Sequence, residues 1–597
     1  MRVSSASISA HDDMEWRMAM KKRFLTWKLL LVLCLALMLS GCAGKEYTVN
    51  FDGNLSVEQT VRSGKKVEEP QAPTQEGRLF LGWFKDAGLT EAWDFANDKV
   101  EDDLTLYPAW ELDTGDEIAY PATDKDFSAL RTPGSQEAEY DYQLFFLPAI
   151  DGVSQPYVGD TMPYYEDGTY YIYYLKEAGD SYNHSVYLAT TEDFVTYTEV
   201  DEVVLEANRG GGQDGWIGTG SVVKVEDKYY FFYTGHSDAA DLEFKETIML
   251  AVGKTPTSFE KVAGWEITPP SSLGQKNDFR DPQGYYDPET GTITLTVTAS
   301  QSGVARILKY TLSADLEEVT YDGIIFTNEV GSFWNLECSD TFKMGDTWYI
   351  TYSAQDDTLW YASSDAPYGP YSPAQRLEGK LFYAAKHVEK DGKVYMVGWA
   401  RRSESVSSTQ DVAGWAGNLI VQQVKQNADG SLILAPVDEI VEQFTVRRVL
   451  AADASHVYLD AGSLYFYEDA FTCYERFMLK GEFTFTGTGS FGLSFDYNGR
   501  NEKNKLIILN PAEDKLQFAF NEGSTLIAEK DVTLQPGQTY AFTYIQEGSV
   551  GTFYIDGMAA LTTRIYGASG KTIKLFAENN AVLFTSLKEY TMPEESR

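Results

Sequence analysis

The stretch Asp167-Gly-Thr-Tyr-Tyr-Ile-Tyr-Tyr174 decides the fold, because close variants of it recur along the chain. Each variant begins with an acidic or glycine-containing turn and continues as a run of aromatic and β-branched residues, which is typical of a buried β-strand. The other variants are Glu226-Asp-Lys-Tyr-Tyr-Phe-Phe-Tyr233, Thr290-Gly-Thr-Ile-Thr-Leu-Thr-Val297, Gly345-Asp-Thr-Trp-Tyr-Ile-Thr-Tyr352 and Asp391-Gly-Lys-Val-Tyr-Met-Val-Gly398.

The spacing of these variants predicts the architecture. Their first residues lie between 46 and 64 positions apart, and a second strand with a turn follows several of them. Hairpins at such a period predict the blades of a β-propeller. A series of β-sandwiches would also contain hairpins, but it would not repeat one strand type at a nearly constant period. We therefore expect residues 141–445 to form a propeller with five blades.

The segments on either side of the repeat differ from it. Residues 446–597 contain alternating strands without the repeat, and their frequent turn signals predict a β-sandwich. Residues 112–140 are rich in Asp, Glu, Thr, Ser and Pro, which predicts a linker. Residues 47–111 have aromatic residues at the ends of short strands and resemble the Listeria–Bacteroides repeat of bacterial surface proteins, a small β-grasp-like spacer or adhesion module. The expected fold class is therefore all-β throughout.

The N-terminus carries a targeting signal. Lys21, Lys22 and Arg23 precede an unbroken apolar run over residues 29–39, which is shorter than the ~20 residues that a membrane-spanning helix needs. The run ends in Leu39-Ser-Gly-Cys42, which resembles a bacterial lipobox, where the cysteine receives lipid. We expect residues 1–41 to be a lipoprotein signal peptide and residues 42–46 to be the lipid-anchored N-terminus at the cell surface, and an ordinary cleaved signal is the alternative.

The composition excludes several classes of protein. The chain has 597 residues, with 49 Lys and Arg against 89 Asp and Glu, so its formal net charge is −40. Such a surface repels nucleic-acid phosphates and gives no basic patch for anionic lipid. With 43% hydrophobic and 14% aromatic residues, the chain is too apolar to be disordered.

Few residues are left to carry chemistry. The five histidines lie too far apart in sequence for a zinc-protease motif, and no Gly-x-Ser-x-Gly or phosphate-loop motif is present. We therefore expect no metal and no cofactor. Three carboxylates, Asp160, Asp281 and Glu337, each precede a recurring strand by a similar number of residues. That shared phase predicts that they open the innermost strands of three blades and meet at the propeller axis.

Two of these carboxylates lie in motifs that resemble a known family. Arg280-Asp281-Pro282 and Glu337-Cys338 resemble the Arg-Asp-Pro and Glu-Cys motifs of glycoside hydrolase family 32, the β-fructosidases. Further similar segments are Trp216-Ile-Gly-Thr-Gly-Ser221, Phe382-Tyr-Ala-Ala385 and Val397-Gly-Trp399. The resemblance extends over residues 140–597, because the family joins a five-bladed propeller to a β-sandwich.

The resemblance implies a retaining hydrolysis of β-fructofuranosides such as levan, inulin, fructo-oligosaccharides or sucrose. Asp160 would attack the anomeric carbon, Glu337 would act as acid and then base, and Asp281 would bind fructose hydroxyls. The residues implied in substrate binding are Arg280, Trp216, Ser221, Tyr383 and Trp399. The partner would be an oligo- or polysaccharide.

One motif departs from the family pattern. The nucleophile segment reads Val158-Gly-Asp-Thr-Met-Pro163, in which Gly159 replaces the usual asparagine, and Leu175 replaces the usual glutamine at the end of the next strand. The resemblance therefore does not define which residues at these two positions contact the fructosyl ring. Two alternatives remain, a related five-bladed arabinofuranosidase or xylosidase that acts with inversion, and a catalytically inactive carbohydrate-binding surface lipoprotein.

Overall fold

The computed structural model describes residues 45–112 and 142–593. The first range has gaps at 53–56, 72, 74–77, 88–91 and 96, and the second has gaps at 149–156, 178–183, 209–210, 275–276, 402–414, 449, 451–454, 496–504, 521–524 and 566–571. The predicted signal peptide (1–41), the lipidation residue Cys42 and the predicted linker 112–140, apart from Leu112, lie outside the described residues.

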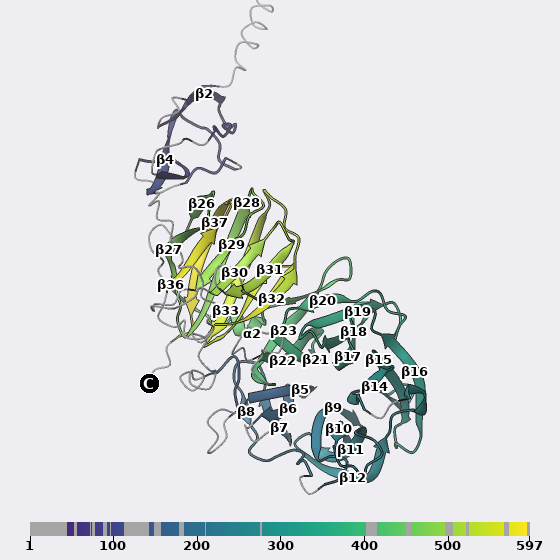
Figure 1. Ribbon diagram of the computed structural model, residues 1–597. Coiled ribbons are helices and arrows are strands. Elements are labelled where there is room, and N and C mark those ends of the chain that lie inside the picture. Colours follow the sequence, from purple (N-terminus) through teal and green to yellow (C-terminus); the bar gives the residue numbers. More distant parts are fainter. Residues whose placement is uncertain are drawn as a thin grey trace, which may run out of the picture. The chain divides into compact units, whose positions relative to one another are not determined.

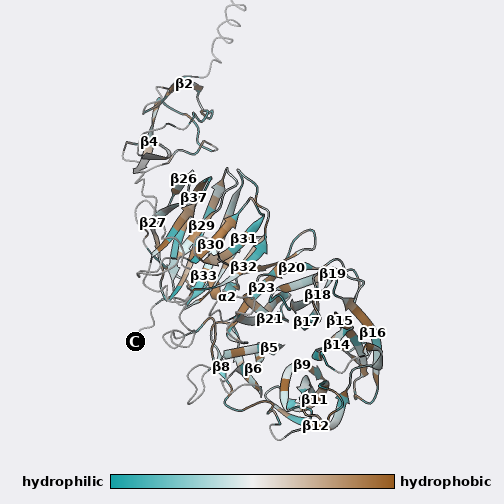
Figure 2. Cartoon of the chain, in the orientation of Figure 1, coloured by the Kyte–Doolittle hydropathy of each residue, from teal (hydrophilic) through white to brown (hydrophobic). Residues whose placement is uncertain are grey.

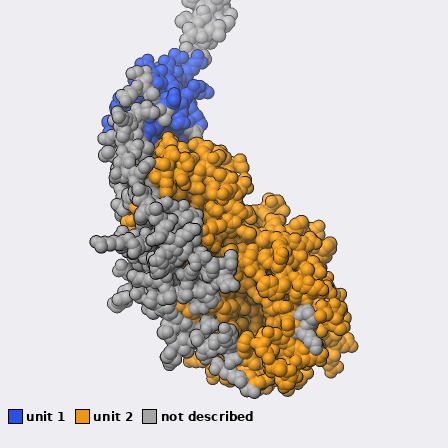
Figure 3. Space-filling view, viewed as in Figure 1, with its two compact units in different colours: residues 1–116 blue, residues 117–597 orange. Residues whose placement is uncertain are grey.

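The chain divides into two compact units, residues 1–116 and residues 117–597 (Figure 3). The first unit contains one four-stranded sheet in the order β2-β1-β4-β3, in which β1 and β4 are parallel. Its strands are β1 (Glu46–Phe51), β2 (Val57–Arg62), β3 (Arg78–Phe84) and β4 (Leu104–Leu112). The aromatic residues expected at strand ends form its core, where the ring of Phe51 packs edge-on against Trp83 with a centroid distance of 4.9 Å.

The second unit begins with groups of four antiparallel strands (Figure 1). The groups are β5 (Tyr157–Glu166), β6 (Thr169–Glu177), β7 (Val186–Thr191) and β8 (Thr198–Glu199); β9 (Trp216–Val225), β10 (Lys228–His236), β11 (Glu246–Thr255) and β12 (Ser258–Ile267); β13 (Phe279–Asp287), β14 (Thr292–Gln301), β15 (Val304–Ser313) and β16 (Val319–Thr327); β17 (Leu336–Met344), β18 (Thr347–Ala354), β19 (Leu359–Ser364) and β20 (Gln375–Glu378); and β21 (Phe382–Lys390), β22 (Lys393–Arg401), β23 (Gly417–Gln426) and β24 (Leu432–Ala435).

The first strands of the groups form a closed ring. Each contacts the first strand of the group on either side, so β5 lies between β9 and β21, and β13 lies between β9 and β17. The last group and the first group also join in one sheet through the pair Gly417 and Val158. This arrangement is a propeller, and it places the β5, β9, β13, β17 and β21 strands around one axis. Figure 1 labels β5, β9, β17 and β21 around the centre of the ring.

The recurring stretch has two roles in this architecture. Its apolar run forms the second strand of each group, β6, β10, β14, β18 and β22. Its first residues form the tight turn that precedes this strand, and Asp167, Glu226 and Asp391 have positive φ angles of 47°, 55° and 52° there. Aspartate and asparagine tolerate this conformation better than most residues, which helps to explain the recurring Asp-Gly turns.

The remainder of the second unit is a β-sandwich of two sheets. One sheet contains β25 (Val446–Arg447), β26 (Val457–Ala461), β28 (Arg476–Phe485), β33 (Thr539–Glu547), β34 (Val550–Ile555), β35 (Ala559–Arg564) and β37 (Asn580–Thr591), and the other contains β27 (Tyr465–Thr472), β29 (Phe491–Phe495), β30 (Lys505–Asn510), β31 (Lys515–Phe520), β32 (Thr525–Asp531) and β36 (Thr572–Ala577). Figure 2 shows hydrophobic stretches along the strands of both the propeller and the sandwich, interrupted by hydrophilic residues.

Helix is nearly absent from the described residues, where the short α2 (Asp438–Val441) and the 3₁₀ turn Ser271–Leu273 are the named helices. The predicted all-β class, with a propeller before a sandwich, is therefore confirmed. Among the described residues, no helix is both long enough and apolar enough to cross a membrane.

Buried charges join the sandwich to the propeller. Arg564 of β35 is 1% exposed, and its guanidinium donates to the carbonyl of Ala400 at 2.8 Å and to Oδ1 of Asn418 at 2.7 Å. Glu547 of β33 accepts hydrogen bonds from the backbone N–H groups of residues 143, 144 and 145, each at 2.8 Å. Buried ions of this kind must be fully paired, so these contacts fix the position of the sandwich on the propeller.

Candidate active site

The ring of first strands carries an irregularity at the same level in every group. In each strand two residues lie opposite one residue of the second strand, which is a β-bulge. The bulged pairs are Gly159 and Asp160 in β5, Gly218 and Thr219 in β9, Asp281 and Pro282 in β13, Cys338 and Ser339 in β17, and Ala384 and Ala385 in β21.

The three predicted carboxylates surround this bulge but are not at equivalent positions. Asp160 is the second bulged residue of its strand, Asp281 is the first, and Glu337 comes immediately before the bulge. The similar spacing of the three acids in the sequence therefore hides a difference of one residue in their positions relative to the bulge. Because a bulge redirects the side chains around it, three different positions can face one space.

That space is a pocket of about 190 Å³. It is lined mainly by acidic, aromatic and polar side chains, which come from the first strands, from the second strands β6 and β10, from β11, and from the segments before the third strands β7 and β23. The lining residues are Asp160, Leu175, His184, Trp216, Ile217, Gly218, Thr219, Thr234, His236, Glu246, Arg280, Asp281, Glu337, Tyr383 and Trp415. Six of the residues predicted from the sequence therefore meet here, namely Asp160, Asp281, Glu337, Arg280, Trp216 and Tyr383.

Asp160 is held by three donors. The indole N–H groups of Trp399 and Trp415 both donate to its Oδ1, at 3.1 and 3.2 Å, and the hydroxyl of Thr219 donates to its Oδ2 at 3.0 Å. Burial raises the pKa of Asp160, and the nearby charge of Glu337 raises it further, while the hydrogen bonds from Trp399 and Thr219 oppose this shift. The three hydrogen bonds fix the orientation of the carboxylate.

Glu337 is more open to solvent than Asp281, with its side chain 29% exposed. Nη2 of Arg280 donates to its Oε1 at 2.8 Å, and the hydroxyl of Tyr383 donates to its Oε2. Arg280 and Tyr383 occupy the same position as Glu337 in their own strands, directly before the bulge. The ring thus brings two donors to the two oxygens of this carboxyl group.

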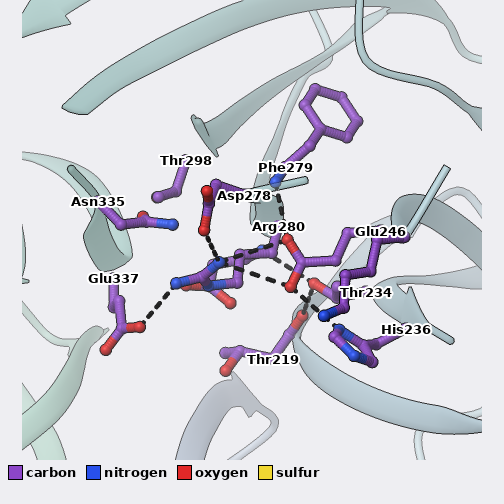
Figure 4. A network of polar contacts seen from close by, with 12 residues as sticks. Thr219, Thr234, His236, Glu246, Asp278, Phe279, Arg280, Thr298, Asn335 and Glu337 are labelled. Carbon is purple, nitrogen blue, oxygen red and sulfur yellow. Dashed lines mark hydrogen bonds and ion pairs between the residues drawn. The ribbon is translucent and has the colours of Figure 1, made fainter. Parts of the chain in front are cut away.

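Arg280 is the centre of a network of charges (Figure 4). Besides Glu337, its guanidinium contacts Asp278 at 3.1 Å and Oε2 of Glu246 at 3.3 Å. Although burial raises the pKa of Glu246, the hydrogen bond with His236 and the charge of Arg280 hold it at about 2. Glu246 is therefore an ionised anchor for the guanidinium on the side away from Glu337.

Asp281 is buried in the site and is 3% exposed. Its Oδ2 accepts the backbone N–H of Cys338 at 2.8 Å, and its own N–H donates to the hydroxyl of Thr234 at 2.9 Å. Burial raises the pKa of Asp281 to about 7, and Arg280 opposes this shift while Glu337 and Asp160 add to it. Asp281 also has a positive φ of 58°, a conformation that such residues adopt mostly where the fold requires it.

Aromatic side chains form the remaining walls. Trp216 stacks on His236 with a centroid distance of 4.7 Å and an interplanar angle of 12°. Trp415 stacks on His184 at 4.1 Å and 15°. Flat aromatic faces in a pocket can pack against an apolar surface of a ligand.

Two predicted substrate-binding residues lie outside the lining. Trp399 is 0% exposed and packs edge-on against Tyr383 at 5.4 Å, so its contact with the site is its hydrogen bond to Asp160. Ser221 is buried on β9, where its hydroxyl accepts the backbone N–H of Gly284 at 2.9 Å. Among the described residues, no group of three or more His, Cys, Asp and Glu side chains is arranged to hold a metal ion.

Several residues of the site were not predicted from the sequence, including Thr219, His236, Glu246, His184 and Trp415. The recurring stretch that ends in Tyr233 could have pointed to His236, because His236 is the last residue of the strand that this stretch forms. Glu246 acquires its meaning only when β11 pairs with β10 and brings it opposite His236. Trp415 carries no motif, and its position depends on the closure of the ring.

Comparisons with known proteins find matches for two parts of the chain. Residues 160–436 match the family model of the Glycosyl hydrolases family 32 N-terminal domain, and residues 47–108 match the Listeria-Bacteroides repeat domain. The chain is 25% identical over 401 residues to sucrose-6-phosphate hydrolase of Escherichia coli, an alignment that covers 63% of this chain and 80% of that protein.

Solved structures show the same fold at lower identity. Exo-inulinase from Aspergillus awamori superimposes with a TM-score of 0.59 at 15% identity, over 76% of this chain and 99% of that one. Fructan 1-exohydrolase IIa from Cichorium intybus gives a TM-score of 0.58 at 16% identity, over 76% of this chain and 98% of that one. The expected resemblance to family 32 and to the surface-protein repeat is therefore confirmed.

Proposed function

Because residues 160–436 carry a glycoside hydrolase family 32 domain, we propose that this protein releases fructose from β-fructofuranosides by a retaining double displacement in the pocket. The observation that carries the proposal is the meeting of Asp160, Asp281 and Glu337 in one pocket, two of them within the family motifs. The relatives that act on sucrose phosphate and fructan support the same type of substrate.

In the first step Asp160 attacks the anomeric carbon of a fructofuranosyl unit. A bond forms between a carboxylate oxygen and that carbon, the glycosidic bond breaks, and Glu337 gives its proton to the leaving oxygen. The three donors to Asp160 fix its orientation for this attack. In the second step Glu337 takes a proton from water, and the hydroxide displaces Asp160, which restores both groups.

The structure suggests roles for the remaining predicted residues. We infer that Arg280 positions Glu337, since its guanidinium bonds that carboxyl group, and that Asp281 binds the fructosyl hydroxyls from the floor of the pocket. Trp399 acts through Asp160, because it is buried beneath the site. Trp216 and Tyr383 are the lining aromatics that could contact the sugar.

The charges of the pocket favour an unphosphorylated substrate. Asp160, Glu246, Asp281 and Glu337 line the pocket with Arg280, whose guanidinium already contacts two of these carboxylates. A phosphate group placed here would meet these carboxylates at short range and would repel them. We therefore propose neutral fructans, fructo-oligosaccharides or sucrose as the substrates.

The proposed location is extracytoplasmic. The repeat domain supports it, as does a relative described as a putative Gly-rich membrane protein of Evansella cellulosilytica, which is 46% identical over 70 residues. That alignment covers 11% of this chain and 8% of the relative. We further propose a lipid anchor at Cys42, on the resemblance of residues 39–42 to a lipobox.

The test of the function is fructose release by the purified protein. It is incubated with levan, inulin, sucrose and an aryl arabinofuranoside, beside the variants Glu337→Gln and Glu389→Gln. Glu389 is an exposed acid at the far end of β21, so it is a matched control. We expect release of fructose, abolished by Glu337→Gln and unchanged by Glu389→Gln. Release of arabinose alone, or binding of polysaccharide with no hydrolysis, would contradict the proposal.

A further inference from the structure

The first bulged residue beside the nucleophile, Gly159, has no room for a side chain. A Cβ atom built at this position would lie 2.0 Å from Cη2 and 2.2 Å from Cζ2 of Trp415. Real Cβ contacts are never this short, so any other residue at 159 would displace the indole ring. The glycine at position 159 and the tryptophan at position 415 therefore depend on each other.

The ring that covers Gly159 also contacts the nucleophile. Nε1 of Trp415 donates to Oδ1 of Asp160 at 3.2 Å, while the benzene edge of the same indole covers the glycine. Trp399 donates to the same oxygen from below and packs edge-on against Trp415 at 6.4 Å. Two indoles thus converge on one carboxylate oxygen, and only one of them belongs to a motif seen in the sequence.

Trp415 also makes a stacking contact with its ring face. His184 stacks against it at 4.1 Å, and Leu175, the single residue opposite the bulge of β5, lines the pocket next to them. Both departures from the family pattern, Gly159 and Leu175, therefore lie in one place. Together with Trp415 they form an apolar wall beside Asp160, which we call the indole wall.

We propose that Trp415 is a positioning residue for Asp160, and that it takes the place at the pocket wall which a side chain at position 159 would otherwise fill. The packing of the indole ring over Gly159 aligns its N–H group with the carboxylate of Asp160. On this side of Asp160 the sugar then contacts the side chains of Trp415 and Leu175, instead of the asparagine and glutamine amides of the family pattern. This inference rests on the proposed function, because it assigns Trp415 to the nucleophile of that reaction.

A double-mutant cycle tests the dependence of the two residues on each other. Gly159→Ala should lower kcat/KM at least 10-fold in the wild-type chain, because the new methyl group displaces the indole. In the Trp415→Ala background the same substitution should change kcat/KM less than 3-fold. An equal effect of Gly159→Ala in both backgrounds would overturn the proposal.

The pH profile distinguishes positioning from mere packing. Trp415→Phe keeps a ring over Gly159 but removes the donor to Asp160, so the pKa of Asp160 should rise and the acidic limb of kcat/KM should move to higher pH. The titratable groups that face Asp160 are Glu337, Asp281, His184 and Cys338. All of them are retained in this variant, so the shift reports the lost donor.

The control is Trp360→Phe, which removes an indole donor bonded to Thr358 outside the pocket and should leave the profile unchanged. An unshifted acidic limb in Trp415→Phe would overturn the positioning role.

The free energy of unfolding of the four chains of the cycle gives a second readout that needs no substrate. If the wild-type protein released no fructose, the proposed function would fail. Non-additive changes in the unfolding free energy for residues 159 and 415 would still support the packing of Trp415 over Gly159, and additive changes would refute it.

Discussion

Glu337, Asp281 and Asp160 each lie at the β-bulge of their own strand, but at three successive positions relative to it: before the bulge, first in it and second in it. This offset is the main finding at the scale of single residues. In a regular strand, neighbouring positions point to opposite faces. The bulge removes that alternation, and Arg280 and Tyr383 reach Glu337 from the same level of their own strands. Each acid is consequently surrounded by donors from other groups of the propeller.

The donor set of Asp160 leads to a prediction for Thr219. Replacing it by valine keeps the shape and removes the hydrogen bond to Oδ2 of Asp160. A hydrogen bond to a charged group contributes about 1.5–3 kcal/mol, so kcat should fall roughly 10- to 100-fold. Steady-state kinetics on sucrose measures this, with Thr190→Val on β7 as the control. A rise in KM with kcat unchanged would indicate that Thr219 does not act through the nucleophile.

At this scale the sequence predicted the acids and the partners Arg280, Tyr383 and Trp399, but not the other partners. The three carboxylates and Arg280 were predicted from motifs and spacing, because these features are local. Thr219, Glu246 and Trp415 could not be found in this way, since each acquires its role only through contact with a residue more than 30 positions away. The offset between the acids also escaped prediction, because a bulge adds one residue without leaving a signal in strand composition.

At the scale of elements, the recurring stretch was the decisive signal. Its Asp-Gly turns and aromatic runs predicted hairpins, and these are the second strands and the turns before them. What the composition could not predict is how the first strands close, since ring closure depends on contacts between different groups. The pair Gly417 and Val158 connects the last group to the first, and it lies next to Trp415 and Asp160 in the sequence.

This closure gives a prediction for Gly417. A Cβ atom at this position would lie 1.8 Å from the carbonyl oxygen of Ala400, which is backbone and cannot rotate away. Gly417→Ala should therefore destabilise the second unit by roughly 2–4 kcal/mol through overpacking, and activity should fall with it. Urea unfolding measures this change. Gly462→Ala is the matched control, because open space surrounds that position, and equal stability of the two variants would contradict the account.

At the scale of the whole molecule, a buried acid lies where the propeller meets the sandwich. Glu378 at the end of β20 is 0% exposed and accepts the backbone N–H of Thr562 on β35. Burial raises its pKa to about 7, against the hydrogen bonds with Thr562. Because the folded protein favours the protonated form, this group's contribution to stability is largest at low pH and is lost as the pH rises through about 7.

Glu378→Gln should remove that loss. Between pH 5 and pH 8.5 the wild-type protein should lose roughly 2 kcal/mol more stability than the variant, since one pKa unit corresponds to ~1.4 kcal/mol. Chemical denaturation at the two pH values measures the difference. Glu513→Gln, at an exposed acid of the sandwich, should follow the wild-type protein. Parallel pH dependence in all three chains would show that Glu378 does not titrate in this range.

The acidity of the molecule has its counterpart in the pocket. The formal charge of −40 excluded nucleic acid at the outset, and the lining carboxylates now argue against an anionic sugar as well. We expect kcat/KM for sucrose 6-phosphate to be at least 10-fold lower than for sucrose, because these carboxylates would repel the phosphate, and the guanidinium of Arg280 in the described lining already contacts two of them. Parallel kinetics on the two substrates at one ionic strength measures the ratio. A preference for the phosphorylated sugar would contradict the proposed substrate class.

The most direct test of the account is to find where the fructosyl group is attached during turnover. The wild-type protein is quenched with acid during the reaction with sucrose, digested and examined by peptide mass spectrometry, beside Asp160→Asn. We predict a fructosyl group on the peptide that contains Asp160, absent from the variant, because retention requires a covalent intermediate at the nucleophile. A fructosyl adduct on another residue, or fructose released with inverted anomeric configuration and no adduct, would contradict the assignment of Asp160.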